Sequence, residues 1–146
     1  MKLHHFTFIL LASISFLVSC ETTGSSGRSV SKHGSKTVYV VSDRPIDDYT
    51  IQSAIASELQ KRGFRVIDSG DKSPSLPKNA LVLHYMDTWF WDVAMYLRYL
   101  DIRIIDGNNS EIIASAKFKN GPIHTFANPQ RVVSDLFKDM DRQKIF

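Results

Sequence analysis

Cys20 has the most reactive side chain of this sequence and is its single cysteine. A thiolate can form a disulfide, bind a metal ion or attack an electrophile. No second cysteine is present to complete a disulfide, and no cluster of metal-ligating side chains surrounds Cys20. A redox or metal-binding role is therefore disfavoured. The position of Cys20, between an apolar run and a Ser- and Gly-rich segment, indicates a different use of the thiol.

The residues before Cys20 have the pattern of an export signal. Lys2 provides a positive charge, and residues 6–18 are uncharged but too short for a membrane span, which needs about 20 apolar residues. Leu17-Val18-Ser19-Cys20 resembles the lipobox of bacterial lipoprotein precursors. The resemblance implies removal of the signal peptide, residues 1–19, by cleavage between Ser19 and Cys20. It also implies attachment of diacylglycerol to the thiol and of a fatty acid such as palmitate to the new amine.

Lipid attachment at Cys20 also predicts where the protein is located, because two or three acyl chains hold a protein permanently at a membrane. In enteric lipoproteins, Asp after the cysteine favours the inner membrane, and this chain has Glu21. We therefore expect a lipid-anchored protein of the bacterial cell envelope, at the outer membrane and facing the periplasm. Residues 20–36 are expected to form a flexible linker spanning about 20–25 Å, so that the domain, residues 37–146, floats near the membrane.

Acid–base chemistry would need carboxylates and histidines that converge. The acidic and histidine side chains considered are Asp87, Asp92, Asp101, Asp106, His33, His84 and His124. Their spacing pairs none of them into a catalytic or metal-binding motif. Asp106 is better explained by the turn that follows it, and Asp101 with Arg103 by an ion pair on one face of a strand. The sequence predicts no catalytic residue, no metal site and no cofactor.

The most distinctive segment is HYMDTWFWDVAMYLRYLD, residues 84–101. Trp89, Phe90 and Trp91 lie between two predicted strands, and one interpretation is an exposed tip that contacts a partner or the membrane interface. The alternative is that these aromatic side chains pack into the core across a hairpin. A third possibility is that the Trp-rich segment lines a groove for a glycan or a lipid.

The elements that must position these residues follow from hydrophobic patterning. Residues 37–41, 64–68, 80–87, 95–106 and 112–119 are predicted strands. The first predicted helix follows Asp47 or Asp48 as N-cap, buries a stripe from Ile51 to Leu59 and stops at Gly63. The second begins at Asn128-Pro129 and buries Val132, Val133, Leu136, Phe137 and Met140. In the last strand, alternation places Ile112, Ala114, Ala116 and Phe118 on one face.

These elements predict one small α+β domain of order β-α-β-β-β-β-α, with a mixed sheet, an antiparallel meander and helices on one face. This order, together with a helix ending in KRGFRVID, resembles the amino-terminal domain of the Tol translocation protein. It also resembles the curli-secretion lipoprotein and several small uncharacterised envelope lipoproteins. The resemblance covers roughly residues 37–140 and implies the same α+β fold.

The formal net charge of +3 comes from interspersed charges, so nucleic-acid binding, which needs a clustered basic footprint, is not expected. The leading hypothesis is a non-enzymatic envelope lipoprotein with a structural or assembly role, which acts through contacts with an unidentified envelope protein. The alternative is a periplasmic binding module for a glycan or lipid that uses residues 84–101. A hydrolase ranks last, because it would need Asp87, Asp92, His84 or His124 to converge.

Overall fold

The computed structural model describes residues 21–44, 49–69, 79–122 and 124–146. The predicted signal peptide, the lipobox with Ser19 and Cys20, and the predicted N-caps Asp47 and Asp48 lie outside the described residues. Within these ranges, neither helix combines the length and the apolar character that a membrane span requires.

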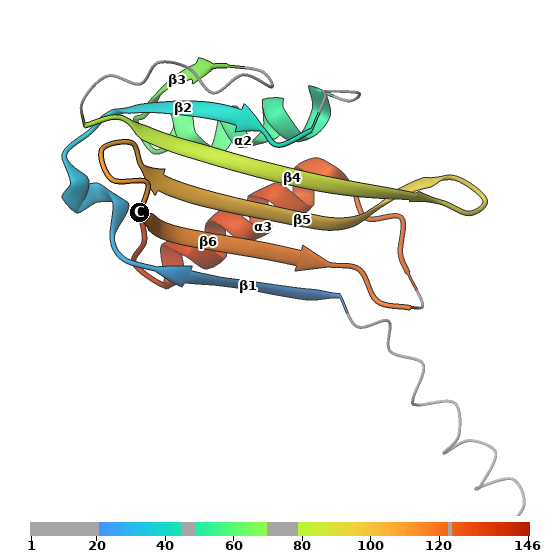
Figure 1. Ribbon diagram of the computed structural model, residues 1–146. Helices are drawn as coiled ribbons and strands as arrows, with labels where there is room; N and C mark the ends of the chain where they lie inside the picture. Colours follow the sequence, from blue (N-terminus) through green and yellow to red (C-terminus); the bar gives the residue numbers. More distant parts are fainter. Residues whose placement is uncertain (1–20, 45–48, 70–78, 123) are drawn as a thin grey trace, which may run out of the picture.

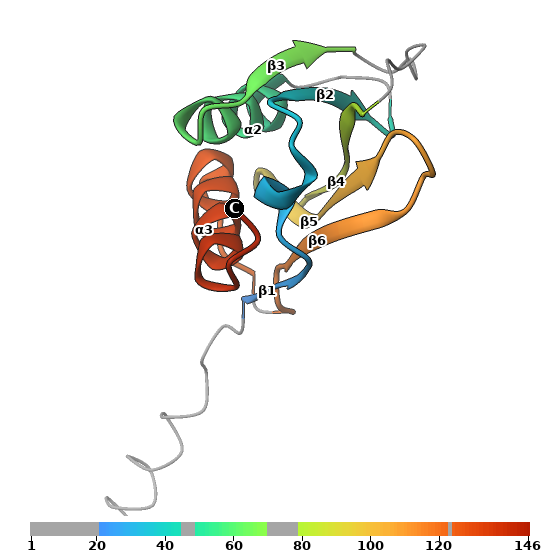
Figure 2. The same ribbon diagram turned by 90° about the vertical axis from the view of Figure 1, so that its left-hand side faces the viewer.

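The domain has two layers, a six-stranded sheet and a pair of helices that covers one of its faces (Figures 1 and 2). The elements are β1 (Thr22–Gly27), the short 3-10 helix η2 (Val30–His33), β2 (Thr37–Ser42), α2 (Tyr49–Lys61), β3 (Arg65–Asp68), β4 (Leu81–Trp91), β5 (Met95–Asp106), β6 (Ile112–Lys119) and α3 (Pro129–Arg142). In the described ranges, the other face of the sheet carries no helix, and we call it the open face.

The strand order is β1-β6-β5-β4-β2-β3. β2 runs parallel to β3 and β4, whereas β4, β5 and β6 form an antiparallel meander. The predicted α+β class, the element order from residue 37 onward and the placement of both helices on one face are therefore confirmed. The helices pack on each other and on the sheet, and the buried apolar side chains of all these elements form one core.

Residues 22–27 form a strand, so the prediction of a flexible linker over residues 20–36 is wrong for this part of the chain. β1 pairs antiparallel with β6, with Thr22 opposite Lys119 and Gly27 opposite Ala114. Its two Gly residues have low strand propensity, and a strand of Thr, Gly and Ser buries little apolar area. The strand forms because β6 offers an unpaired edge and because Ser25 Oγ donates a 2.5 Å hydrogen bond to Asp139 Oδ2 in α3.

Gly27 has a steric role at the end of β1. A Cβ at this position would lie 2.5 Å from both Cα and Cβ of Ala114, and the φ angle of Gly27 is 154°. Glycine is the residue that permits such a close approach of two backbones. The glycine that marks a flexible linker in the sequence is therefore a packing requirement of the sheet.

The helix boundaries follow the predicted signals. The Asn128 side chain accepts a hydrogen bond from the Arg131 backbone N–H, and proline occupies the first turn of α3. Gly63 has φ 81°, and the N–H groups of Gly63 and Phe64 donate to the carbonyls of Gln60 and Leu59. This is the Schellman pattern that ends a helix. The five predicted core positions of α3, from Val132 to Met140, are all buried.

Ile112 is a correction to the predicted face of β6. Ala114, Ala116 and Phe118 are buried as expected, but Ile112 is exposed and Ile113 is buried instead. The register between β5 and β6 shifts at Ile104/Ile105, so the alternation does not extend back to Ile112. A bulge of this kind moves a side chain to the other face without any signal in the hydrophobic pattern.

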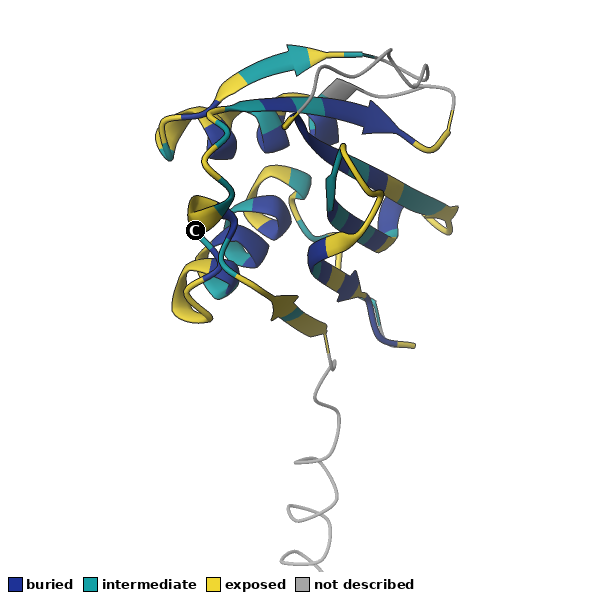
Figure 3. Cartoon of the chain, turned by 60° about the vertical axis from the view of Figure 1, so that its left-hand side comes forward, coloured by how far each residue is buried: buried dark blue, intermediate teal, exposed yellow. Residues whose placement is uncertain are grey.

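The end of the sheet where β1 stops is closed by segments that pack into the core, and we call it the closed end. Val30 in η2 and Ile145 after α3 are both buried, and the Val30 N–H donates to the Ile145 carbonyl at 2.6 Å. The Phe146 ring stacks on Phe137 at 5.4 Å. The C-terminal residues and η2 therefore seal the core together (Figure 3).

Arg62 connects the two helices at this closed end. Its guanidinium contacts Glu58 Oε2 at 2.7 Å and Asp141 Oδ2 at 2.6 Å, and it lies over the Phe137 ring. Burial opposes ionisation of Glu58, but hydrogen bonds from Lys61 and Arg62 outweigh it and hold the pKa of Glu58 below its ordinary value. Burial likewise opposes the charge on Arg62, and hydrogen bonds to Asp141 and Glu58 raise its pKa.

Candidate functional site

The β4–β5 hairpin projects beyond the rest of the sheet, at the end opposite the closed end (Figure 1). β4 and β5 have 11 and 12 residues, against 8 in β6 and 6 in β2. The Thr88–Tyr99 pair is the last one before a register shift, after which Trp89 pairs with Leu97 and Trp91 with Met95. The predicted aromatic tip therefore lies on a protruding ribbon.

Exposed apolar side chains gather at this end of the molecule. Trp91 is 74% exposed and Val93 is 85% exposed. We use the name apolar end for the five exposed side chains Phe90, Trp91, Val93, Met95 and Phe126. The other large apolar side chains that are exposed in the described ranges are Met86, Tyr99 and Ile112. A cluster of this kind marks a contact surface more often than single exposed residues do.

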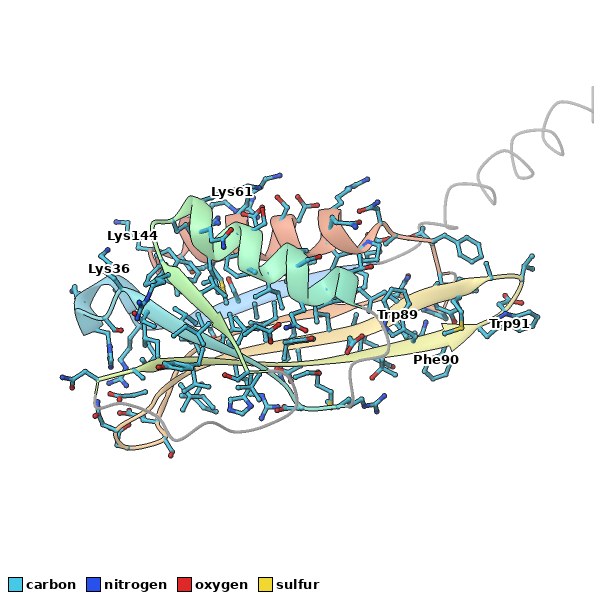
Figure 4. The ribbon with its side chains drawn as sticks, turned by 90° about the horizontal axis from the view of Figure 1, so that it is seen from above. Lys36, Lys61, Trp89, Phe90, Trp91 and Lys144 are labelled. Carbon is cyan, nitrogen blue, oxygen red and sulfur yellow. The ribbon has the colours of Figure 1, made fainter. Side chains whose placement is uncertain are left out.

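The structure separates the two tryptophans that the sequence places together. The Trp89 side chain is partly buried against the core, and its Nε1–H donates to Asp87 Oδ2 at 2.5 Å. Figure 4 shows Trp89 set back along the hairpin and Trp91 at its far end. The interpretation as core packing is therefore correct for Trp89, and the interpretation as an exposed side chain is correct for Trp91.

A stack of rings supports the hairpin from the β6–α3 connection. The His124 ring lies parallel to Tyr96 at 3.8 Å between centroids, and the edge of Phe126 meets both rings. His124 Nε2 is also 3.5 Å from Asp92 Oδ2. Phe90 contacts Tyr96 from the other strand, at 6.5 Å. These contacts join the hairpin and the β6–α3 connection into one surface.

Asn120 fixes the connection that carries His124 and Phe126. It is fully buried, its Nδ2 donates to the carbonyls of Leu97 and Thr125, and its Oδ1 accepts from the Thr125 N–H. Arg98 Nη1 donates to the Gly121 carbonyl in the same segment. The buried amide therefore makes one hydrogen bond to β5 and two within the connection, so that its polar atoms are satisfied as a buried side chain requires.

The described part of the chain starts at the same end of the sheet. β1 runs from the end with the hairpin tip toward the closed end, so Thr22 is its residue nearest to the apolar end (Figure 1). Thr125 Oγ1 donates to Glu21 Oε1, which places Glu21 beside the connection that carries Phe126. A cleft here is lined by Glu21, Thr23, Phe118, Phe126, Arg131 and neighbouring residues, but by neither tryptophan.

The predicted acid–base candidates fall into groups at different places on the sheet, and His84 and Asp101 belong to one chain of ion pairs. His84 Nδ1 is 2.7 Å from Asp43 Oδ1, and Arg103 Nη2 is 2.6 Å from the other oxygen of Asp43. Arg103 also approaches Asp101 at 3.6 Å, which confirms the predicted ion pair, and Lys117 contacts Asp101 at 3.3 Å. These groups form a ladder of alternating charge across the open face. Ionic ladders between strands are a usual feature of a solvated sheet face.

The remaining candidates are distributed in the same way. His124 contacts Asp92 at the hairpin tip, and Asp87 accepts a hydrogen bond from Trp89. Asp106 organises its turn as predicted, because the Asn108 N–H donates to its Oδ1 at 2.8 Å and lowers the pKa of the carboxylate. His33 also contacts Asp106, at 3.2 Å. Among the side chains that the structure describes, no group of three His, Cys, Asp or Glu is arranged to hold a metal ion.

Sequence reasoning identified Trp89, Phe90 and Trp91 but missed the residues that complete the surface. Phe126 and His124 lie more than 25 positions further along the chain, and only the β6–α3 connection brings them to the hairpin. The role of Asn120 could not be predicted, because the sequence does not distinguish an asparagine that is buried from one in an exposed turn.

Comparison with known proteins finds similarity in fold only. No protein-family model and no curated protein sequence matches this chain. Among solved structures, the chain is similar to the PelC dodecamer from Paraburkholderia phytofirmans, with TM-score 0.56 and 16% identity over 87% of this chain and 99% of that chain. A PelC variant from the same organism gives TM-score 0.54 and 16% identity over 86% and 98% of the two chains.

A third structure, a PDZ domain protein from Parabacteroides distasonis, gives TM-score 0.49 and 15% identity over 90% of this chain and 39% of that chain. At these identities the similarity to PelC shows a shared fold.

Proposed function

We propose that this chain is a lipid-anchored protein of the bacterial cell envelope, held at the outer membrane through Cys20. In this proposal it acts through contacts with other protein chains, in a structural or assembly role, and catalyses no reaction. The observation that carries the protein-contact part is the outer edge of β1. This strand is last in the sheet order, and no strand lies beyond it in the described part of the chain.

Natural proteins usually protect an edge strand with charged residues, proline or a bulge. β1 has the sequence TTGSSG, so it has none of these charges and no proline, and its pairing with β6 is regular along its whole length. Five of its six residues are exposed. Such an edge can accept a further strand through backbone hydrogen bonds, which is a common mode of protein recognition.

Two other observations support the proposal. The acid–base side chains are engaged in ion pairs at two different places, the open face and the hairpin tip, which favours a binding role over a hydrolytic one. The similar PelC chains are described as dodecamers, so the fold is compatible with assembly from copies of one chain. The alternative, a glycan or lipid site between Trp89 and Trp91, has less support because the Trp89 side chain packs against the core.

The anchor is tested at Cys20. Cys20→Ala should leave the unprocessed precursor and abolish labelling by a fatty-acid analogue, while Ser19→Ala, which keeps a small residue before the cysteine, should be processed and labelled. Labelling that persists in Cys20→Ala would contradict the anchor.

The edge is tested at Thr23. The Arg28 N–H donates to Ile113 in β6, and N–H directions alternate along a strand, so the Thr23 N–H faces away from β6. Thr23→Pro removes this donor and blocks the edge, whereas Thr23→Val keeps the donor. In native mass measurements on detergent-extracted protein, we expect wild type and Thr23→Val in complexes and Thr23→Pro as a single chain. A single-chain mass for all three would contradict the proposal.

A further inference from the structure

The connection between the predicted lipid attachment point and the sheet is very short. β1 begins at Thr22, so Glu21 alone lies between Cys20 and the first residue of the sheet. Two residues span at most about 7 Å. Glu21 is itself held by its contact with Thr125. A lipid on Cys20 would therefore keep the start of β1 against the membrane surface, and the domain cannot float at the distance that a flexible linker would allow.

The apolar end lies at the same end of the sheet and reaches as far as this connection does. Following the register across the sheet, Thr22 pairs with Lys119, Lys119 with Tyr99 and Tyr99 with Thr88. β4 continues for three residues beyond Thr88, to Trp91. At a rise of about 3.3 Å per residue, the tip extends roughly 10 Å past the level of Thr22. A membrane within reach of Cys20 is within reach of the tip.

The side chains of the apolar end suit the interface of a bilayer. Trp is enriched where headgroups meet acyl chains, because its ring is amphipathic. Trp91 and Phe90 supply aromatic area, and Val93 in the turn and Met95 at the start of β5 add apolar area. Asp92 is largely exposed next to Trp91, and a hydrated carboxylate limits the depth of insertion to the headgroup region.

We propose that the apolar end is seated in the headgroup region of the membrane that carries the Cys20 lipid, with Phe90, Trp91 and Phe126 at the boundary with the acyl chains. The inference rests on the lipid anchor of the proposed function. The lipid and the apolar end then form two contacts with the same surface, and two contacts fix an orientation where the lipid alone leaves the domain free to tilt.

This orientation also sets the direction in which the outer edge of β1 points. The strands run from the apolar end to the closed end, so they rise from the membrane. The outer edge of β1 then faces sideways along the membrane plane, where neighbouring anchored chains diffuse. The membrane contact therefore presents the free edge to partners at the same height.

The experiment uses the lipidated full chain in vesicles of phosphatidylethanolamine and phosphatidylglycerol in equal amounts, with or without brominated acyl chains. Bromine quenches tryptophan emission only at short range, and Trp89 and Trp91 are the two tryptophans of the chain. Wild type should lose roughly twofold more emission in brominated vesicles than Trp91→Phe does, because Trp91 is the residue at the interface. The exposed position of Trp91 makes Trp91→Phe safe for the fold.

A matched control places a tryptophan at the other end of the sheet. Ile112 is 53% exposed at the closed end, so Ile112→Trp in the Trp91→Phe background gives a tryptophan of similar exposure far from the membrane. This variant should show no more quenching than Trp91→Phe. Equal quenching of wild type and Trp91→Phe would overturn the inference.

Flotation of the vesicles separates the two proposals. Protein that floats with the vesicles without Trp91 quenching overturns the membrane contact and leaves the anchor intact. Protein that does not float shows that the lipid anchor has failed, and the inference fails with it.

Discussion

The two ends of the sheet differ in the burial of their apolar side chains. At the closed end, Val30 in the short helix η2 and Ile145 after α3 lie outside the long helices and the strands and are nevertheless buried in the core. At the apolar end, Trp91 is the last residue of β4 and Val93 lies in the turn that follows, and both are exposed to solvent. Regular structure therefore does not predict burial in this molecule.

The difference shows what each end contributes. Apolar residues of the closed end are explained by the stability of the fold, because they fill the space between the sheet and the helices. Those of the apolar end make few contacts with the core, and the core has no need of them. A cluster of exposed apolar side chains more often marks a contact surface than single exposed residues do, so the difference between the two ends supports the proposal that the hairpin is a contact surface.

Ile145→Ala should have the largest effect on stability. The side chain is fully buried, and its removal leaves a cavity beside Val30 and the aromatic side chains of the tail. Substitutions of this kind cost about 2–5 kcal/mol of unfolding free energy, measured by urea denaturation. Ile112→Ala, at the same end but exposed, should cost less than about 0.5 kcal/mol. Similar losses for both variants would contradict the division between buried and exposed residues at the closed end.

Gly27→Ala should lower the unfolding free energy by about 1–3 kcal/mol, because its Cβ would overlap Ala114 and force β1 away from β6. Gly24→Ala is the control in the same strand, since a Cβ at Gly24 meets no atom within 4 Å. Amide hydrogen exchange at positions 24 and 26, whose N–H groups face β6, should rise in Gly27→Ala and stay unchanged in Gly24→Ala. Fast exchange at these two positions in the wild type would contradict the strand and favour the predicted flexible linker.

Glu58→Gln should destabilise the closed end by about 1–2 kcal/mol at neutral pH, through loss of charged hydrogen bonds to Lys61 and Arg62. The folded pKa of Glu58 is lowered from 4.5, so its contribution is present above pH 4.5 and is lost as the pH falls through the lower folded value. The difference between wild type and Glu58→Gln should therefore shrink below pH 4.5. Lys61→Gln, at an exposed position, should change stability by less than about 0.5 kcal/mol. A difference that is constant with pH would exclude the ionised carboxylate as its source.

Trp91→Ala should have the smallest effect on stability, below about 0.5 kcal/mol, because its side chain is 74% exposed. Trp89→Ala is the contrast two residues away and should cost about 2 kcal/mol, because its ring packs against the core and its N–H bonds to Asp87. Thermal unfolding of both variants measures this. A large loss for Trp91→Ala would mean that the apolar end belongs to the core.

Local patterns were sufficient wherever a residue and its partner are close in the chain. Asn128-Pro129 predicted the start of α3, Gly63 predicted the end of α2, and the period of apolar residues predicted the core face of α3. In the candidate site, the run from Trp89 to Trp91 was visible for the same reason. Phe126 and Asn120 were not, because their neighbours in space are distant in sequence.

The sequence by itself determined the element order from residue 37 to the C-terminus and the α+β class, because hydrophobic periods and caps are local properties. It also provided the lipobox pattern around Cys20, which stays a prediction. The tertiary structure decided that residues 22–27 form a strand, because this segment gains its stability from the edge of β6, from Asp139 and from the tail at Ile145. It also decided that Trp89 is partly buried and Trp91 exposed, because a register shift and the end of the sheet, rather than residue type, set their surroundings.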